Sequence, residues 1–232
     1  MEQKTKVLVG SACHKPHKEF TESLSKFLIN CSLTYNIVCY QVFGKELVDA
    51  QNEIADVFIK SNYDYLLMVE DDNWGFTLEM LNALVKSDKP IIGIKYYSRH
   101  APHVVLPMRP HPTQMHKGMM ELLGPTGIVT VYLVPFGMTL IKREVFSYLD
   151  KPYFALNEVT KDSPDQYATD HNFCHRLMMA GVALFGLYDY CLMHRGMGEE
   201  HRQERMDNML AGSFKHNLRV RDNIKRDELR NG

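Results

Sequence analysis

The sequence YLLMVEDD occupies residues 65–72 and decides the expected fold of this 232-residue chain. Five apolar residues in succession, without the alternation of a half-buried strand, are typical of a parallel strand covered on both faces. Three carboxylates, Glu70, Asp71 and Asp72, follow at its carboxyl end. Ligands of open α/β sheets bind beyond the carboxyl ends of the strands. We therefore expect an α/β protein with a ligand site at these carboxylates.

Strand and helix patterns alternate around this stretch through the first hundred residues. The predicted strands cover residues 6–10, 36–43, 65–69 and 90–95, and the predicted helices cover residues 17–30, 49–62 and 77–86. Alternation of this kind is typical of a doubly wound α/β core with a mostly parallel central sheet. The small residues 11–13 are expected to form a loop after the first strand.

The second half of the chain is expected to add a small antiparallel sheet and a further helix and strand. Residues 128–133 and 138–142 are predicted to pair with each other around the turn at residues 135–137. The remaining patterns predict helices over residues 144–149 and 170–180 and a strand over residues 183–188. Gly181 supplies the stop signal of the second helix.

Length and patterning indicate one domain followed by a tail. A chain of 232 residues is long enough to bury a substantial core within one ordinary domain. The sequence contains no repeat and no Gly/Ser-rich linker that would mark a second domain. We predict a domain over residues 1–211 and a basic tail over residues 212–232.

Composition narrows the classes of partner and compartment. Hydrophobic residues make up 45% and charged residues 24% of the chain, which is typical of a soluble globular protein. A formal net charge of −1 gives no general attraction to nucleic acid or to an anionic membrane. No apolar run approaches the roughly 20 residues of a membrane span. We therefore expect a cytoplasmic protein.

The five cysteines are expected to be reduced and buried. Their number is odd, no CxxC pair occurs, and most lie in apolar stretches. This pattern is typical of free thiols in a reducing compartment, and it argues against a cysteine zinc site.

Residues 70–72 need a cation if they are to bind a phosphate, because like charges repel. Mg²⁺ and Mn²⁺ prefer hard oxygen ligands together with substrate phosphates. Alternate side chains of an extended segment point to the same side, so Glu70 is expected to face ribose hydroxyls while Asp72 holds the metal. Asp71 is included among the nucleotide-sugar contacts, although its side chain is expected to point the other way. The alternative is that the acidic residues end the strand only because the chain turns toward solvent.

Residues 62–73 (NYDYLLMVEDDN), with residues 89–97 (KPIIGIKYY) after the next helix, resemble GT-A glycosyltransferases of family 2, including small bacterial and phage-borne members. Those proteins end this strand with a D-x-D motif, in which Glu70 here takes the first position. Further similar segments follow in the family's order at residues 134–146 (VPFGMTLIKREVF), 169–176 (TDHNFCHR) and 192–196 (LMHRG). The resemblance extends over most of residues 6–198. It implies a single GT-A, Rossmann-like domain whose small antiparallel sheet lies on the acceptor side.

The resemblance also implies a metal and a catalytic base. Asp72 and His194 match the family's metal ligands, with Mn²⁺ or Mg²⁺ as the cofactor. Asp170 matches the carboxylate that acts as general base in inverting members. The bland alternatives are that His194 is an ordinary loop histidine, one of 11 in the chain, and that Asp170 caps a helix. Thr169 stands where the family usually has another carboxylate, so the base role falls on Asp170 alone.

The nucleotide-sugar contacts implied by the resemblance are Ser11, Asn52 and Gly137, with Glu70 and Asp71. Ser11 and Asn52 match contacts to the nucleotide base and ribose, and Gly137 would let the backbone approach the sugar. Ordinary solvated side chains and a plain turn explain these three residues equally well. Gln51 stands near the position where many members have an arginine, which puts a pyrophosphate contact there in doubt.

The expected function is transfer of a sugar from a nucleotide-diphosphate donor, UDP-sugar by default, to a hydroxyl acceptor, with inversion. The acceptor is a hydroxylated DNA base or a surface glycan, and a phage-encoded protein would act in the host cytoplasm. Lysines and arginines of the tail suit DNA phosphates, but a solvated helix explains them equally well. The His- and Pro-rich residues 100–117 are expected to form a lid. The alternatives are a nucleotidyltransferase, although residues 10–15 (GSACHK) lack its glycine pattern, and a non-catalytic nucleotide-sugar binding module.

Overall fold

The computed structural model describes residues 4–97, 105–106, 109–110, 119–120, 126–156 and 169–195. These residues belong to one compact unit, Met1–Arg195, and a second unit covers Gly196–Gly232. The predicted tail and most of residues 100–117 lie outside the described residues. The predicted domain boundary at residue 211 and the predicted lid therefore stay predictions.

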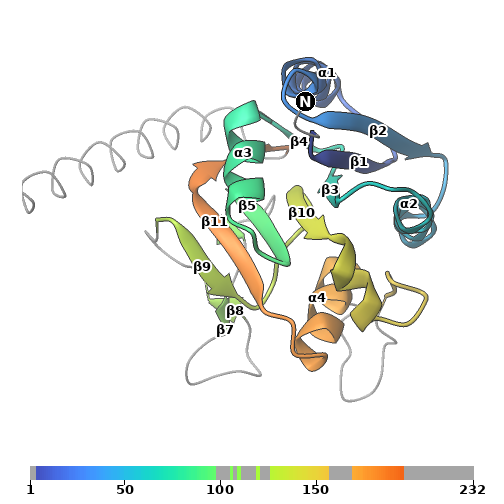
Figure 1. Cartoon of the computed structure of the whole chain (residues 1–232), viewed down its shortest axis with the longest axis vertical. Coiled ribbons are helices and arrows are strands. Elements are labelled where there is room, and N and C mark those ends of the chain that lie inside the picture. The colour runs from blue at the N-terminus through green and yellow to red at the C-terminus, as the bar shows by residue number, and fades with distance from the viewer. Residues whose placement is uncertain are drawn as a thin grey trace, which may run out of the picture. The chain divides into compact units, whose positions relative to one another are not determined.

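A central sheet with the strand order β2-β1-β3-β10-β5-β11-β9 organises the described unit (Figure 1). Its strands are β1 (Lys6–Cys13), β2 (Asn36–Phe43), β3 (Tyr65–Val69), β5 (Ile91–Tyr97), β9 (Ile128–Val131), β10 (Met138–Lys142) and β11 (Leu184–Cys191). β1 runs parallel to β2 and β3, and β5 runs parallel to β11. Only β10 and β9 run against their neighbours on this path. The prediction of a mostly parallel α/β sheet is confirmed.

Helices cover both faces of the sheet, which explains why β3 lacks an apolar–polar alternation. The helices are α1 (Lys18–Ser32), α2 (Leu47–Lys60), α3 (Leu78–Lys86), the 3₁₀ helix η1 (Arg143–Tyr148) and α4 (Thr169–Met179). Leu67 and Val69 pack in one apolar core with α1 and α3, whereas Leu66 and Met68 pack in the other with α2, η1 and α4. Both faces of β3 are therefore apolar. Polar side chains can come only after the strand ends, at its carboxyl end.

The predicted pairing of residues 128–133 with 138–142 is wrong. β10 lies between β3 and β5, and β9 pairs with β11 at the edge of the sheet (Figure 1). Burial explains the difference, because the first four residues of β10 are all buried, whereas β9 is largely exposed on one face. A strand with apolar residues on both faces is suited to a central position, and a half-exposed strand is suited to an edge.

Residues 11–13 are also not the predicted loop. β1 continues to Cys13, because Ser11, Ala12 and Cys13 stay in register with the last residues of β2. The small antiparallel sheets of the described part are β4 (Asn73–Trp74) with β12 (Met193–His194), and β7 (Arg109–Pro110) with β8 (Met119–Met120). A further short strand, β6 (Val105–Leu106), pairs with β5.

Two expectations drawn from composition can be compared with the described residues. All five cysteines are free, and Cys13, Cys31 and Cys174 are buried. Among the described helices, none has the length and apolar character needed to cross a membrane.

Candidate active site at the carboxyl end of β3

A two-stranded sheet brings together Asp72 and His194, which are 122 residues apart in the sequence. β4 follows the acidic cluster directly and pairs with β12, so that Asn73 lies opposite His194. The backbone N–H of Arg195 donates to the carbonyl oxygen of Asp72 at 2.8 Å. The side chains meet as well, with His194 Nε2 3.3 Å from Asp72 Oδ2. Both side chains are largely buried, 7% exposed for His194 and 13% for Asp72.

The second oxygen of Asp72 is held by its neighbour. Asn73 donates from Nδ2 to Asp72 Oδ1 at 2.8 Å, which fixes the plane of the carboxylate. Asn73 is fully buried, and its own Oδ1 has no hydrogen-bond partner. A buried amide oxygen is normally satisfied, so this atom is an exception within the candidate site.

Glu70 meets Tyr96, a residue that the sequence did not single out. The Tyr96 hydroxyl, at the carboxyl end of β5, donates to Glu70 Oε2 at 3.3 Å. The phenol is 3% exposed. Its pKa is raised well above the usual value, first by burial and then by the negative charges of Glu70, Asp170 and Asp72. The hydroxyl therefore stays protonated and donates. The charges of three carboxylates act on it, two from the segment after β3 and one from α4.

The ring of Tyr96 also explains Gly137. A Cβ on Gly137 would lie 2.5 Å from Cε1 of Tyr96 and 3.1 Å from Oδ1 of Asn73. A side chain at this position is excluded because the tyrosine ring already occupies the space. The predicted sugar contact of Gly137 stays a prediction, and its demonstrated role is to admit Tyr96.

Asp71 points away from this group and organises the loop after β1. Its Oδ2 accepts hydrogen bonds from the backbone N–H groups of His14 and Lys15, at 2.8 and 3.0 Å. Two such bonds to one carboxylate fix the start of the β1–α1 connection against the end of β3. The different direction of the Asp71 side chain agrees with the alternation expected for the acidic cluster.

Asp170 lies in the first turn of α4, beside a histidine. Its Oδ1 accepts from the backbone N–H of His171 at 2.8 Å and lies 3.2 Å from His171 Nδ1. The Asp170 side chain is 14% exposed, so it is neither fully buried nor freely solvated. Asp170 can accept a hydrogen bond at the start of α4 and still belong to the candidate site, because its charge also acts on Tyr96.

Ser11 and Asn52 have their hydrogen bonds within the fold, away from the Asp72–His194 pair. Ser11 is fully buried on β1, with its hydroxyl oxygen 3.3 Å from Cys13 Sγ. Asn52 lies on α2 and uses both ends of its amide on the backbone of Phe154, donating at 2.7 Å and accepting at 3.1 Å. Asn52 thereby anchors the segment after η1. The structure does not bring either residue into contact with the Asp72–His194 pair, and their nucleotide contacts stay predictions.

The pair Asp72 and His194 suits a divalent cation in its donor chemistry. A carboxylate oxygen and an imidazole nitrogen are ligands of Mn²⁺, and Mn²⁺ and Mg²⁺ sites are commonly completed by substrate phosphates. In the part of the chain that the structure describes, no group of three or more His, Cys, Asp or Glu side chains forms a closed metal site. Such a two-residue site fits a metal that arrives with, or is completed by, a ligand.

Tyr96 and Asn73 are the residues that sequence reasoning missed. Tyr96 belongs to the segment GIKYY, and Asn73 follows the acidic cluster directly. A buried strand ending in tyrosine gives no sign of which carboxylate the hydroxyl will meet, because that depends on the sheet order.

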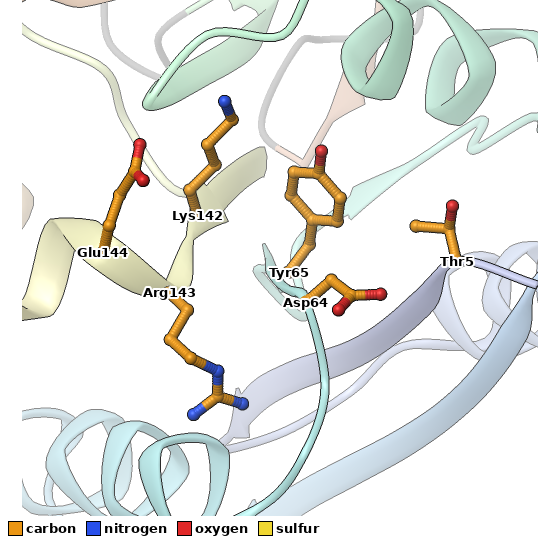
Figure 2. Close-up of a pocket in the computed structure, with 6 residues that line it drawn as sticks. All are labelled: Thr5, Asp64, Tyr65, Lys142, Arg143 and Glu144. Carbon is orange, nitrogen blue, oxygen red and sulfur yellow. The ribbon is translucent and has the colours of Figure 1, made fainter.

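A separate hollow of about 450 Å³ lies at the opposite end of β3. It is lined by Thr5, Asp64, Tyr65, Lys142, Arg143 and Glu144 (Figure 2). Figure 2 shows the Arg143 side chain directed toward α2. The guanidinium donates to the carbonyl oxygens of Tyr63, Ile59 and Phe58 at the end of that helix. This hollow is a gap between structural contacts and contains none of the predicted site residues.

Comparison with known proteins supports the fold. No family model and no curated protein matches the sequence. Among solved structures, A197 from STIV matches with a TM-score of 0.50 and 13% identity, over 82% of this chain and 85% of that one. GalNAc-T7, solved with UDP, GalNAc and Mn²⁺, gives a TM-score of 0.47 and 11% identity, over 84% of this chain but 45% of that one.

Similarity at these identities bears on the fold alone. The match to A197 agrees with the GT-A-like, Rossmann-type α/β fold that the sequence predicted. The finer resemblance to family 2 and to phage-borne proteins stays a prediction.

Proposed function

We propose that this chain is a metal-dependent glycosyltransferase that moves a sugar from a nucleoside-diphosphate donor, a UDP-sugar by default, to a hydroxyl acceptor. The observation that supports the proposal most is the meeting of Asp72 Oδ2 and His194 Nε2 at 3.3 Å, from positions 122 residues apart. Glu70 lies within hydrogen-bond reach of Tyr96 at the same end of the sheet. Ligand sites at the carboxyl ends of strands are the rule for open α/β sheets.

The donor side of the proposed site consists of Asp72, His194 and Glu70. Asp72 and His194 would hold Mn²⁺ or Mg²⁺, which when bound neutralises charge on the leaving diphosphate. Glu70 would accept hydrogen bonds from ribose hydroxyls, with Oε2 kept in place by Tyr96. Asp71 would act indirectly, because it holds the backbone of His14 and Lys15 beside the site.

The acceptor side of the proposed site depends on Asp170. A hydroxyl is a poor nucleophile until its proton is removed, and a carboxylate within hydrogen-bond reach can accept that proton. Asp170 would take the proton while the new bond to the sugar C1 forms and the bond from C1 to the diphosphate oxygen breaks. One displacement from the face opposite the leaving group inverts the configuration at C1. The hydrogen bond from the His171 N–H keeps Oδ1 of Asp170 oriented at the start of α4.

Ser11, Asn52 and Gly137 complete the proposed nucleotide-sugar contacts. Ser11 and Asn52 would each have to exchange an internal hydrogen bond for one to the nucleotide. Gly137 would offer backbone atoms beside the ring of Tyr96, which fills the space of a Cβ at this position.

The acceptor classes of the proposal are a hydroxylated DNA base and a surface glycan. A DNA acceptor would be recognised with the help of lysines and arginines among residues 212–232. Binding would then depend steeply on salt concentration, because each phosphate contact releases counterions. Truncation after Gly212 should remove that dependence for DNA and leave transfer to a glycan unchanged.

The test of the proposed function is a screen for nucleoside-diphosphate release from common sugar nucleotides, with Mn²⁺ or with EDTA. We expect slow release from one donor in Mn²⁺ and none in EDTA, since water can replace the acceptor. Release of pyrophosphate from a nucleoside triphosphate would instead identify a nucleotidyltransferase. Metal-dependent binding without turnover on any acceptor would identify a binding module.

A further inference from the structure

We propose that Tyr96 is the positioning residue of this site. Its hydroxyl holds Glu70 and its ring holds His194, so the nucleotide half and the metal half of the site keep one relative position. The ligands named for these halves rest on the proposed function, whereas the placement of the side chains does not.

Three contacts from three segments define the position of the Tyr96 ring. The hydroxyl donates to Glu70 Oε2 at 3.3 Å, at the end of β3. The centroid of the ring lies 5.1 Å from that of the His194 imidazole, with 57° between the planes, next to β12. The ring edge fills the space where a side chain on Gly137 would lie. One rigid side chain therefore touches the segments that bear both halves of the site.

The fit around the ring leaves little freedom. Tyr96 is 3% exposed, and a Cβ on Gly137 would come within 2.5 Å of Cε1 and 2.9 Å of Cδ1. Real Cβ atoms do not approach ring carbons so closely, so an alanine at this position must displace the ring. Because the ring packs against the imidazole of His194, its displacement should move His194, in the metal half, more than Glu70.

The two contacts of Tyr96 can be removed separately. Tyr96→Phe deletes the hydroxyl and keeps the ring, so it releases Glu70 without moving His194. Gly137→Ala keeps the hydroxyl but pushes on the ring next to His194. A residue that acts only as core packing would give the two variants the same defect, a loss of stability without a ligand-specific change.

The binding test uses Mn²⁺ alone, followed by UDP at saturating Mn²⁺. For Tyr96→Phe we expect the dissociation constant of UDP to rise about tenfold, the loss typical of one hydrogen bond to a charged group. The dissociation constant of Mn²⁺ should stay within about twofold in that variant. For Gly137→Ala we expect the larger change in Mn²⁺ binding.

Tyr35→Phe is the matched control. Tyr35 is 7% exposed, and its hydroxyl donates to Asn82 Oδ1 at 2.7 Å, in the core beneath α1 and α3. Its loss costs a comparable buried hydrogen bond but touches no site residue. Equal UDP binding by Tyr96→Phe and Tyr35→Phe would overturn the positioning role.

A second readout does not depend on any ligand. The ¹H–¹³C NMR signal of the His194 ring, assigned with His194→Gln, reports the ring current of Tyr96. Gly137→Ala should shift this signal, and Tyr96→Phe should leave it nearly in place. An unchanged signal in Gly137→Ala would overturn the inference. Absence of Mn²⁺ and UDP binding in the unmodified protein would count against the proposed function, while this signal would still decide the position of the ring.

Discussion

Charged residues lie at both ends of β3, but they are arranged differently. Charges of both signs lie at the amino end, whereas carboxylates gather at the carboxyl end. At the amino end, around the hollow of Figure 2, Asp64, Lys142 and Arg143 are each held by other groups of the fold. Arg143 binds the carbonyl oxygens at the end of α2, Lys142 pairs with Asp88 at 2.6 Å, and Asp64 accepts from the Lys6 N–H at 2.8 Å. At the carboxyl end, the charges of Glu70, Asp72 and Asp170 converge on the neutral phenol of Tyr96.

The difference shows that a hollow lined by charged residues does not by itself identify a site. At the amino end, Asp64, Lys142 and Arg143 already have protein partners, so a ligand would gain little from binding to them. At the carboxyl end, the partners of Asp72 include an amide and a titratable imidazole, neither of which is a permanent cation. Gathering carboxylates in a buried place costs free energy unless a cation joins them. The edge where carboxylates gather is therefore the better candidate.

Asp72→Asn, with Asp64→Asn as its counterpart at the other end, should give the largest contrast. Asp72→Asn removes the charge of the proposed metal ligand, so Mn²⁺-dependent nucleoside-diphosphate release should fall to the level seen in EDTA. Asp64→Asn keeps an oxygen that can accept from the Lys6 N–H, so its release rate should equal that of the unmodified protein. Equal activity of the two variants would contradict the claim that only the carboxyl end of β3 takes part in function.

Asp170→Asn should separate chemistry from binding. Loss of a general base lowers turnover by about 10²- to 10⁴-fold, whereas UDP binding in Mn²⁺ should be unchanged because the proposal gives Asp170 a role toward the acceptor only. Single-turnover transfer and calorimetric UDP titration measure the two quantities. Retained turnover would remove Asp170 as the base, and lost UDP binding would move it to the donor side.

Arg143→Ala should act on stability alone. The guanidinium binds three carbonyl oxygens at the end of α2 and lies 4.5 Å over the ring of Phe58. We expect the free energy of unfolding in urea to fall by about 2 kcal/mol, because partly buried carbonyls lose their donor. Activity per folded molecule should not change. A fall in that specific activity would show that the amino-end hollow takes part in function after all.

Asp88→Asn should give the smallest effect. Asp88 is 81% exposed, and its partner Lys142 lowers its pKa. Any stabilisation is therefore present at neutral pH and lost as Asp88 protonates on acidification. The backbone at Asp88 has a φ of 53°, which asparagine tolerates. The urea midpoints of the two proteins should agree within error at pH 7 and at pH 3. A clear difference at pH 7 would show that this exposed ion pair stabilises the fold more than we expect.

The sequence predicted the local elements of the fold better than their arrangement. The strand at residues 65–69 and the alternation around it follow from apolar runs and helical spacing, which are local properties. The place of β10 between β3 and β5 does not, because neighbours in a sheet are chosen by burial in three dimensions. For the same reason the predicted pairing of residues 128–133 with 138–142 failed.

The candidate site divides in a similar way. The acidic cluster could be found from its position after an apolar run, and His194 and Asp170 came from the resemblance to a family. Their metal and base roles stay predictions, although the structure brings Asp72 and His194 within reach of each other. Tyr96 could not be found, because its importance depends on contacts with Glu70, Gly137 and His194, which lie far apart in the sequence.

The insertion of β10 has a consequence for the order in which the chain can fold during synthesis. β3 and β5 do not pair with each other, and the strand that joins them is made only at residues 138–142. A nascent chain that ends before β10 therefore holds the β2-β1-β3 half of the sheet with an open edge at β3, while β5 still lacks both of its neighbours, β10 and β11. Such open edges are prone to wrong contacts and slow the search for long-range contacts. His194 emerges later still. The carboxylates of residues 70–72 are thus translated early and receive their last partner only when the domain is nearly complete.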